Sequence, residues 1–281
     1  MIQMSENIDH ALYNLKPKHR IFGQHIMVND ALPNRILSGT VQVKSSIRSF
    51  SENGVIFEGE TEETPVDAVI FATGYQFKFP FFDESETALH VRDGNELDLY
   101  RLVFPPTYKH AHTMAFVGLI QPIGSIFPIA EMQSRWFCEL MLGRCRPLPE
   151  LPVMMSEVKH RRTKLKSQYY EGAKHSVQVE FVSYMEELAR QFGVRPNMWE
   201  YFTTDPKLWY KLLFGPLVSY QYRLTGPGSW HDARRAVMEV DERIEKPLQT
   251  RAGALKNSGL SNQIVIILTI FLMAIVYYYF F

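Results

Sequence analysis

A short apolar run that ends in a glycine constrains this chain more than any other feature. Residues 66 to 75 read VDAVIFATGY, so that Val69, Ile70 and Phe71 lead directly into Ala72-Thr73-Gly74. A run this short and apolar is typical of a strand buried on both faces, as in a parallel sheet. Gly74 has no Cβ, so a ligand can approach the main chain at the carboxyl end of that strand, where open α/β sheets bind ligands. An ordinary buried strand that ends in a glycine turn explains the same residues equally well.

A second segment of the same kind spans residues 118 to 128, GLIQPIGSIFP. It predicts the end of a strand, a Gly/Pro turn, and a helix that has Pro128 near its first turn, continues to Leu142 and stops at Gly143. The first N–H groups of such a helix are unpaired and carry partial positive charge, which favours a ligand that bears negative charge. A strand, turn and helix without a ligand remains an equally good interpretation.

The rest of the pattern is mixed. Residues 47–50 and 54–58 predict a β-hairpin around the turn at residues 51–54, and residues 68–71 predict the central strand that follows it. Beyond Pro147 the pattern becomes helical, with helices expected at residues 181–192 and 207–214. The fold class that this order predicts is α/β, with a helical C-terminal region.

Composition excludes several classes of function. The chain has 30 basic and 30 acidic residues and a formal net charge of +0, which argues against nucleic acid as a main partner. Its two cysteines, Cys138 and Cys145, lie roughly 10 Å apart along a predicted helix, too far for an undistorted disulfide. A reduced body that faces the cytosol follows as the simplest inference. His110 and His112 have no third ligand at a suitable spacing, so the sequence predicts a surface loop there and no metal site.

The C-terminus carries a long apolar segment. Residues 264 to 281, IVIILTIFLMAIVYYYFF, contain no charged side chain, and a helix of that length is about 27 Å long, near the hydrocarbon thickness of the endoplasmic reticulum bilayer. Basic residues precede it and none follows. We therefore expect a single-pass C-terminal anchor in the endoplasmic reticulum membrane, with the body in the cytosol. A buried terminal helix is the alternative, although such a helix normally carries a polar stripe.

Several motifs together resemble one protein family. FATGY at residues 71–75 resembles the corresponding segment of the flavin-containing monooxygenases, the enzymes that form dimethylaniline N-oxide. Further segments resemble the family in the same order along the chain: NDALPNRILSG at 29–39, VFPP at 103–106, GLIQP at 118–122, GVRPN at 193–197, TDPK at 204–207 and YRLTGPG at 222–228. The resemblance implies FAD and NADPH as cofactors and the N- and S-oxygenation of soft nucleophilic amines and sulfides with O₂. It implies that Thr73, Gly74, Tyr75 and Gln121 line the cofactor site, and it identifies no catalytic acid or base.

The family also has two glycine-rich G-x-G-x-x-G turns that hold the pyrophosphates of FAD and NADPH. This sequence contains neither of them, and we expect it to represent the C-terminal half of the family protein. The resemblance then implies partial dinucleotide-binding, Rossmann-like sheets. Residues 1–74 would end the NADPH-binding domain, 75–150 would end the FAD-binding domain, 151–259 would form a helical membrane-facing region, and 260–281 would form the transmembrane helix. The alternative is a catalytically inactive, membrane-tethered chain that associates with full-length relatives.

Overall fold

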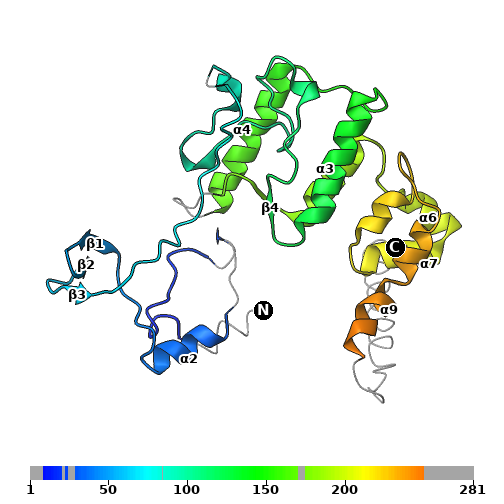
Figure 1. Cartoon of the computed structure of the whole chain (residues 1–281). Helices are drawn as coiled ribbons and strands as arrows, with labels where there is room; N and C mark the ends of the chain where they lie inside the picture. The colour runs from blue at the N-terminus through cyan, green and yellow to red at the C-terminus, as the bar shows by residue number, and fades with distance from the viewer. Residues whose placement is uncertain (1–8, 21–22, 25–28, 84, 170–174, 250–281) are drawn as a thin grey trace, which may run out of the picture. The chain divides into compact units, whose positions relative to one another are not determined.

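The computed structural model describes residues 9–20, 23–24, 29–83, 85–169 and 175–249 (Figure 1). The chain divides after Arg195 into two compact units, which are described one at a time. This division reflects packing alone, and the domain boundaries that we predict at residues 74, 150 and 259 stay predictions.

A small antiparallel sheet opens the first unit. Helix α2 (Ala31–Leu37) precedes it, and strand β1 (Ile47–Phe50) pairs with β2 (Gly54–Phe57), which pairs in turn with β3 (Thr64–Pro65). The hairpin predicted from the sequence is therefore confirmed. Gly54 is required where β2 begins, because a Cβ at that position would lie 2.4 Å from the Thr64 carbonyl oxygen.

The buried parallel strand predicted for residues 68–71 is wrong. These residues form no strand, and the side chains of Ile70 and Phe71 are 90% and 73% exposed. A strand can be buried on both faces only if strands lie beside it and other elements cover it. In the described part of the chain, no strand pairs with this segment, and the Phe71 ring has one aromatic neighbour, Phe50, at 6.3 Å between centroids.

The Rossmann-like sheets are likewise not found among the described residues. These residues form the three-stranded antiparallel sheet and a two-stranded parallel pair, β4 (Gln121–Pro122) with β5 (Gln178–Val179). The fold class is therefore corrected to a mixed α/β arrangement of helices and two small sheets. A dinucleotide-binding sheet requires several long parallel strands, and each strand of the parallel pair here contains 2 residues.

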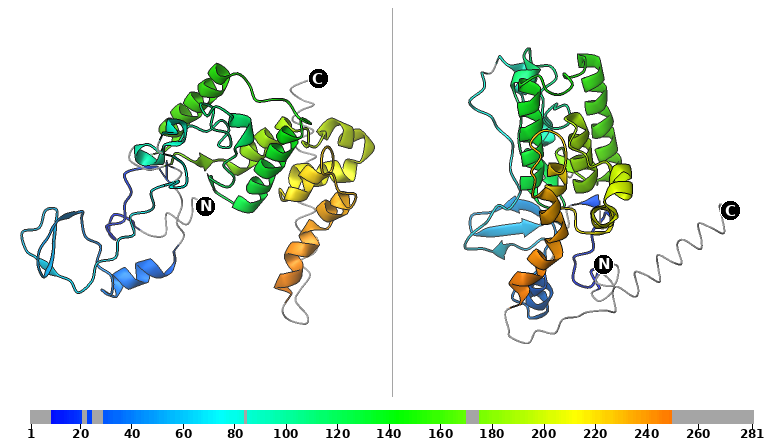
Figure 2. Two further views of the ribbon diagram at one scale, coloured as in Figure 1. Left: turned by 45° about the horizontal axis from the view of Figure 1, so that its top comes forward. Right: turned by 90° about the vertical axis from the view of Figure 1, so that its right-hand side faces the viewer.

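Three long helices form the body that follows in the first unit (Figures 1 and 2). They are α3 (Ile126–Met141), α4 (Leu151–Gln168) and α5 (Phe181–Gln191), and α3 packs against α5. Buried side chains recur at helical spacing on the facing surfaces: Ile129, Met132, Gln133 and Trp136 on α3, and Tyr184, Met185 and Leu188 on α5. The helix predicted to end at Gly143 is confirmed, because α3 is capped by Leu142 and Gly143 adopts a φ of +66°.

A second apolar cluster lies under the loops that precede α3. Leu89, Leu99 and Phe116 are buried there, and Phe79 stacks edge-on against Phe116 at 5.2 Å between ring centroids. Three short 3₁₀ helices, η2 (Thr87–Leu89), η3 (Asp93–Asn95) and η4 (Ala111–Thr113), carry the chain around this cluster. The cluster fixes the loops that lead from residue 75 to the start of β4.

The second unit is helical. It contains α6 (Met198–Thr204), α7 (Pro206–Phe214), η5 (Ser219–Arg223), α8 (Ala233–Met238), α9 (Val240–Glu245) and η6 (Lys246–Leu248). Asp205 caps α7 by accepting a hydrogen bond from the Leu208 N–H at 3.2 Å, and Pro206 follows at the first helical position. Arg234 on α8 forms two hydrogen bonds to the same carboxylate, so α8 is tied to the start of α7.

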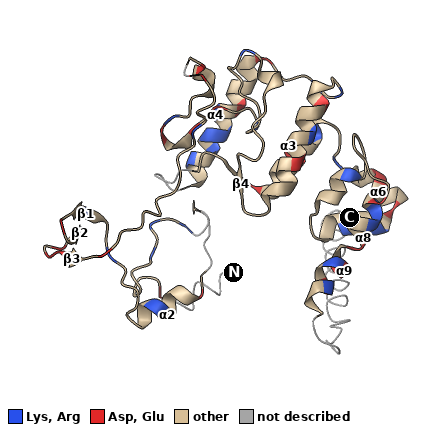
Figure 3. Ribbon diagram, in the orientation of Figure 1, with Lys and Arg blue, Asp and Glu red and all other residues tan. Residues whose placement is uncertain are grey.

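The predicted membrane anchor needs a correction as well. Residues 264–281 lie outside the described residues, and no described helix is both long enough and apolar enough to cross a bilayer. The longest described helix, α4, has 18 residues but carries charged side chains along its length (Figure 3). The structure therefore does not support a transmembrane helix or a location in the endoplasmic reticulum membrane that depends on one.

Candidate functional site

The turn between β4 and α3 combines exposed apolar side chains with an uncapped helix N-terminus. The side chain of Ser125, the N-cap residue of α3, makes no capping hydrogen bond to the first turn. The neighbouring Ile123, Ile126 and Phe127 are all exposed, Phe127 to 85%. The first turn of α3 can therefore receive hydrogen-bond acceptors from a ligand, and apolar side chains surround that position.

Glycine is required inside this turn. Gly124 has a φ of +144°, and a Cβ at this position would lie 3.1 Å from the ring of Phe181, the first residue of α5. The close contact between the Gly124 backbone and the Phe181 side chain places the turn before α3 beside the start of α5. The turn is therefore fixed by packing on one side and open on the other.

Gln121 stands at the entrance to this turn. Its N–H donates a hydrogen bond of 2.8 Å to the Val177 carbonyl oxygen, and in the parallel β4–β5 pair it lies opposite Gln178. The Gln121 side chain is partly exposed, whereas Gln178 is buried. Two carboxamide side chains thus occupy paired positions where β4 leads into the turn.

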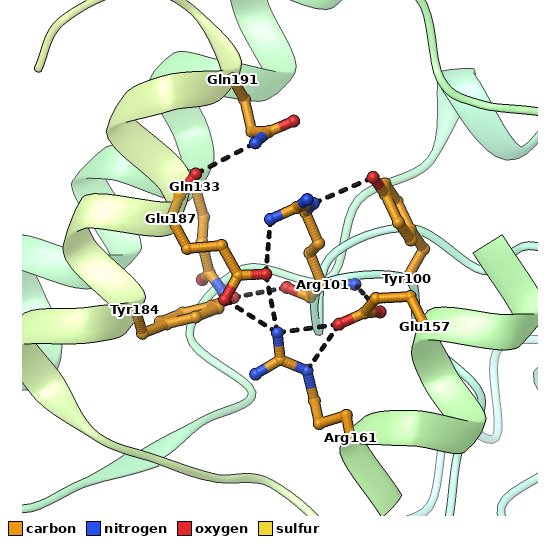
Figure 4. Close-up of polar contacts among 8 residues, drawn as sticks. All are labelled: Tyr100, Arg101, Gln133, Glu157, Arg161, Tyr184, Glu187 and Gln191. Carbon is orange, nitrogen blue, oxygen red and sulfur yellow. Dashed lines mark hydrogen bonds and ion pairs between the residues drawn. The ribbon is translucent and has the colours of Figure 1, made fainter. Parts of the chain in front are cut away.

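A chain of buried hydrogen bonds holds the residue at which this segment begins. The Gly118 N–H donates to Gln133 Oε1 at 2.8 Å, Gln133 Nε2 donates to the Tyr184 hydroxyl at 2.9 Å, and that hydroxyl donates to the Arg101 carbonyl oxygen at 2.5 Å. Figure 4 shows Gln133, Tyr184 and Arg101 in this arrangement. Burial raises the pKa of Tyr184 far above its usual value, so the phenol stays protonated and remains a hydrogen-bond donor.

Arg101 is itself held from two helices, by an ion pair to α5 and by a backbone hydrogen bond to α4 (Figure 4). Its guanidinium lies 2.5 Å from Glu187 on α5, and its backbone N–H donates to Glu157 on α4 at 3.3 Å. Arg161 pairs with both carboxylates, at 2.8 Å to Glu187 and 2.9 Å to Glu157. Burial alone would lower the pKa of Arg161, but Glu187 and Glu157 outweigh that effect and raise it.

The backbone at Arg101 is unusual. Arg101 has a φ of +50° and Leu102 a φ of +56°, although neither residue is a glycine. Left-handed backbone is costly for residues with a Cβ and persists only where the surroundings impose it. The ion pairs and the Tyr184 hydrogen bond supply that constraint, so the network fixes the loop at Arg101 and, through Gln133, the start of the 118–128 segment.

Asn95 connects the 73–75 segment to the same region. Its side chain accepts a hydrogen bond from the Phe77 N–H at 2.8 Å and donates one to the Tyr75 carbonyl oxygen at 2.9 Å. The Ser176 hydroxyl donates to the Asn95 carbonyl oxygen at 2.8 Å. Because Val177 binds Gln121, Tyr75 and Gln121 are both attached to residues 176–177.

The other two predicted site residues are less constrained. Thr73 and Gly74 are exposed and make no hydrogen bond in the described part of the chain. Gly74 has a φ of +86°, and no atom lies within 4 Å of the position that a Cβ would occupy. The main chain at Gly74 is therefore open to a ligand, and of the four predicted residues only Tyr75 and Gln121 are tied to a common segment.

Three residues that shape this region carry no signal that we recognised in the sequence: Asn95, Gln133 and Tyr184. Asn95 follows Asp93-Gly94, a typical turn, and has a φ of +62°, so a turn was foreseeable there but its contact with Tyr75 was not. Gln133 and Tyr184 lie on the apolar faces of α3 and α5, where a buried polar residue is the only indication of a role.

The residues of this region fit the ring of FAD but not its pyrophosphate. A flavin ring is a flat apolar surface with hydrogen-bonding edges, and the uncapped α3 N-terminus, Gln121 and the exposed Ile123 and Ile126 offer complementary groups. The pyrophosphate of FAD needs a glycine-rich turn before a helix, and Gly226-Pro227-Gly228 in the second unit is the nearest motif in the sequence. Among the described residues, no group of three or more His, Cys, Asp or Glu side chains could hold a metal ion.

Comparison with known proteins gives a consistent result. The family model described as Flavin-binding monooxygenase-like matches residues 1–281. Flavin-containing monooxygenase 5 of Cavia porcellus is 43% identical over 276 residues, which cover 98% of this chain and 50% of that protein. The human protein of the same name is 43% identical over 263 residues, covering 94% of this chain and 48% of that protein.

A second group of relatives has a different name. Dimethylaniline monooxygenase [N-oxide-forming] 2 of Cavia porcellus is 42% identical over 250 residues, covering 89% of this chain and 46% of that protein. The chain thus spans about half the length of the curated relatives that it matches.

Proposed function

Because the chain belongs to the flavin-binding monooxygenase-like family, we propose that it forms part of a flavin-dependent monooxygenase. Its reaction would be the N- or S-oxygenation of small nucleophilic amines and sulfides, with NADPH as reductant and O₂ as oxidant. The match to the family along the whole of residues 1–281 is the observation that carries this proposal. The relatives named for N-oxide formation support the reaction class.

The residues at the β4–α3 turn would bind and orient the flavin ring. The first N–H groups of α3 and the carboxamide of Gln121 would face the polar edge of the ring, and Ile123 and Ile126 would cover part of its apolar face. Thr73, Gly74 and Tyr75 would border the cofactor, with the open backbone of Gly74 allowing close approach. A bound flavin supplies the oxygen-activating chemistry, whereas the protein supplies binding, orientation and protection from water.

The structural support for this assignment lies in how firmly the turn is held. Gly118 is bound by Gln133, Gly124 packs on Phe181, and Gln121 is bound by Val177. Sites that must position a planar ring need such fixed backbone, because small displacements weaken oriented hydrogen bonds. The exposed side of the turn is left for the ligand.

The experiment that tests this function is flavin retention by the full chain. The purified chain is incubated with FAD and desalted, and its absorbance is recorded before and after addition of NADPH under nitrogen. Retained flavin that is bleached by NADPH supports the proposal. A colourless protein after desalting, with free FAD recovered in the small-molecule fraction, contradicts it for the chain on its own.

A second candidate function has its own observation. Residues 66–71 expose Val69, Ile70 and Phe71, and exposed apolar runs of this kind are typical of surfaces that another polypeptide covers. The chain would then act as a non-enzymatic partner that associates with a full-length relative. Co-purification of the untagged chain with a tagged full-length relative of the family tests this, and Phe71→Ser should abolish it. Failure of the wild-type chain to co-purify would overturn this candidate.

A further inference from the structure

A closed loop of the first unit, residues 92–98, carries two acidic side chains. The Arg92 N–H donates a hydrogen bond of 2.8 Å to the Glu96 carbonyl oxygen. The Arg92 guanidinium also donates two hydrogen bonds to the Asp98 carboxylate, at 2.9 and 3.0 Å. Two parallel bonds of this kind fix a guanidinium and a carboxylate in one relative orientation. The loop is therefore closed by its backbone and by its side chains.

Helix α4 binds this loop through basic side chains. Arg162 pairs with both acidic residues of the loop, since its Nη2 atom donates to Asp98 and its Nε atom lies 3.5 Å from the Glu96 carboxylate. Lys166, one turn later on α4, lies 3.8 Å from the same Glu96 carboxylate. The preceding residue, Arg161, pairs instead with carboxylates of α4 and α5, so α4 is attached to the rest of the unit independently of the loop.

These ion pairs are partly shielded from solvent. The side chains of Asp98, Glu96 and Arg162 are 17%, 29% and 33% exposed. Fully exposed ion pairs contribute little to stability because water and salt screen them, whereas partly buried pairs are screened less. The pairs between α4 and the loop can therefore hold the loop in place and still respond to dissolved salt.

The loop in turn holds a segment that lies 18 to 20 residues earlier in the chain. Asn95, which is buried within the loop, accepts a hydrogen bond from the Phe77 N–H at 2.8 Å and donates one to the Tyr75 carbonyl oxygen at 2.9 Å. The Tyr75 side chain is 90% exposed, so its packing contributes little to the position of this segment. The position of the loop therefore decides how firmly residues 75–77 are held.

We propose that the pairing of Arg162 with Glu96 and Asp98 forms an ionic clamp through which α4 positions residues 75–77, and that dissolved salt loosens this segment. Arg162 is the positioning residue, because it contacts both carboxylates of the loop from the helix. High ionic strength screens these charges, the loop separates from α4 more often, and the Asn95 hydrogen bonds open with it. The proposal goes beyond the proposed function, because the clamp acts on residues 75–77 whether or not a flavin is bound.

Hydrogen–deuterium exchange of the full chain at two salt concentrations, without any ligand, tests the clamp. The Phe77 N–H is bonded to Asn95, so a peptide that covers Phe77 reports the opening of the loop. Exchange is corrected for that of the unfolded chain at the same salt concentration. It should be about threefold faster at about 1 M than at about 0.1 M NaCl, since the Debye length falls from about 10 Å to about 3 Å. Equal corrected exchange at the two concentrations overturns the proposal.

Substitutions on α4 identify the charge responsible. Arg162→Met removes the guanidinium but keeps a long stem, and should give about threefold faster exchange at low salt with a salt effect below about 1.5-fold. Lys164→Met, which removes the same charge from an exposed position of α4, is the matched control and should behave as the wild type at both salt concentrations. Arg162→Lys keeps the charge and should restore about half of the protection that Arg162→Met loses, because an ammonium cannot span both carboxylates as a guanidinium does.

The outcomes separate the charge of Arg162 from its packing. Exchange in Arg162→Met that matches Lys164→Met at both salt concentrations overturns the role of Arg162. Exchange in Arg162→Lys as fast as in Arg162→Met assigns the effect to the shape of the arginine and overturns the electrostatic clamp. Far-UV circular dichroism and thermal melting check that each variant folds, and the salt comparison on the wild-type chain decides the proposal if Arg162→Met does not fold.

Discussion

The Tyr184 hydroxyl donates a hydrogen bond of 2.5 Å to the carbonyl oxygen of Arg101, 83 residues earlier in the chain. Through this bond the apolar face of α5 holds a loop whose backbone is left-handed at two successive residues. The same hydroxyl accepts from Gln133, which binds Gly118. One phenol therefore connects the ion-paired loop with the segment proposed to hold the flavin ring.

Tyr184→Phe should destabilise the first unit by about 1–3 kcal/mol, because it leaves the buried Arg101 carbonyl and the Gln133 amide without their partner. Urea unfolding followed by circular dichroism measures the change. Tyr210→Phe, at a position that is 43% exposed, is the control and should change stability by less than about 0.5 kcal/mol. A loss no larger for Tyr184→Phe than for the control would show that the network is not stabilising.

Asn95→Ala should release residues 75–77, because it removes the hydrogen bonds to the Tyr75 carbonyl and the Phe77 N–H. Hydrogen–deuterium exchange of a peptide covering Phe77 should become about fivefold faster, as expected for one lost hydrogen bond. Asn34→Ala, on the exposed surface of α2, should leave that peptide unchanged. Unaltered exchange in Asn95→Ala would mean that packing alone orders the segment.

Asp98→Asn should reduce the loss of folding stability that occurs as the pH falls into the acid range. Burial alone would raise the pKa of Asp98, but Arg92 and Arg162 outweigh burial and hold the pKa below its usual value of 3.8. A carboxyl whose folded pKa is depressed adds stability that is present above the unfolded pKa and is lost as pH falls through the folded pKa. Wild type should therefore lose more stability than Asp98→Asn between about pH 5 and pH 2.

Chemical denaturation at a series of pH values measures this difference. Asp67→Asn, at an exposed position, is the control and should follow the wild-type curve. Parallel curves for wild type and Asp98→Asn across that range would contradict the assignment of acid sensitivity to this ion pair.

Gly124→Ala should weaken FAD binding by the chain by about tenfold or more. The added Cβ would lie 3.1 Å from the Phe181 ring, and alanine tolerates a φ of +144° poorly, so the turn before α3 would have to move. Titration of FAD fluorescence measures the affinity. Gly59→Ala provides the control, since Gly59 also has a positive φ but open space around its Cβ position. Equal affinities for Gly124→Ala and wild type would remove the turn from the proposed site.

Local patterns predicted local structure well. The hairpin at β1–β2, the Gly/Pro turn followed by α3, and the Asp205-Pro206 start of α7 all depend on residues close in sequence, whose turn and capping preferences decide the outcome. The resemblance implied that Tyr75 and Gln121 line one cofactor site; both are attached to residues 176–177, and their part in cofactor binding stays a prediction.

Long-range structure was predicted poorly. The apolar run at Val69, Ile70 and Phe71 was read as a buried strand, but burial depends on neighbours that the run does not itself encode. The contacts of Asn95 and Gln133 with Tyr75 and Gly118 were missed because each joins residues that only the folded chain brings together. The predicted anchor was assigned from apolar length and flanking basic residues; it lies outside the described residues, and no described helix could span a membrane.

The left-handed pair at Arg101 and Leu102 also limits which residues evolution can place there. Glycine or asparagine at either position would adopt this backbone at low cost, whereas valine, isoleucine or threonine would oppose it most strongly. Arg101 is further restricted, since glycine would relieve the backbone but would leave the Glu187 carboxylate paired with Arg161 alone, while the backbone N–H would still donate to Glu157. At position 101 the backbone therefore favours glycine or asparagine, whereas the ion pair with Glu187 on α5 favours arginine.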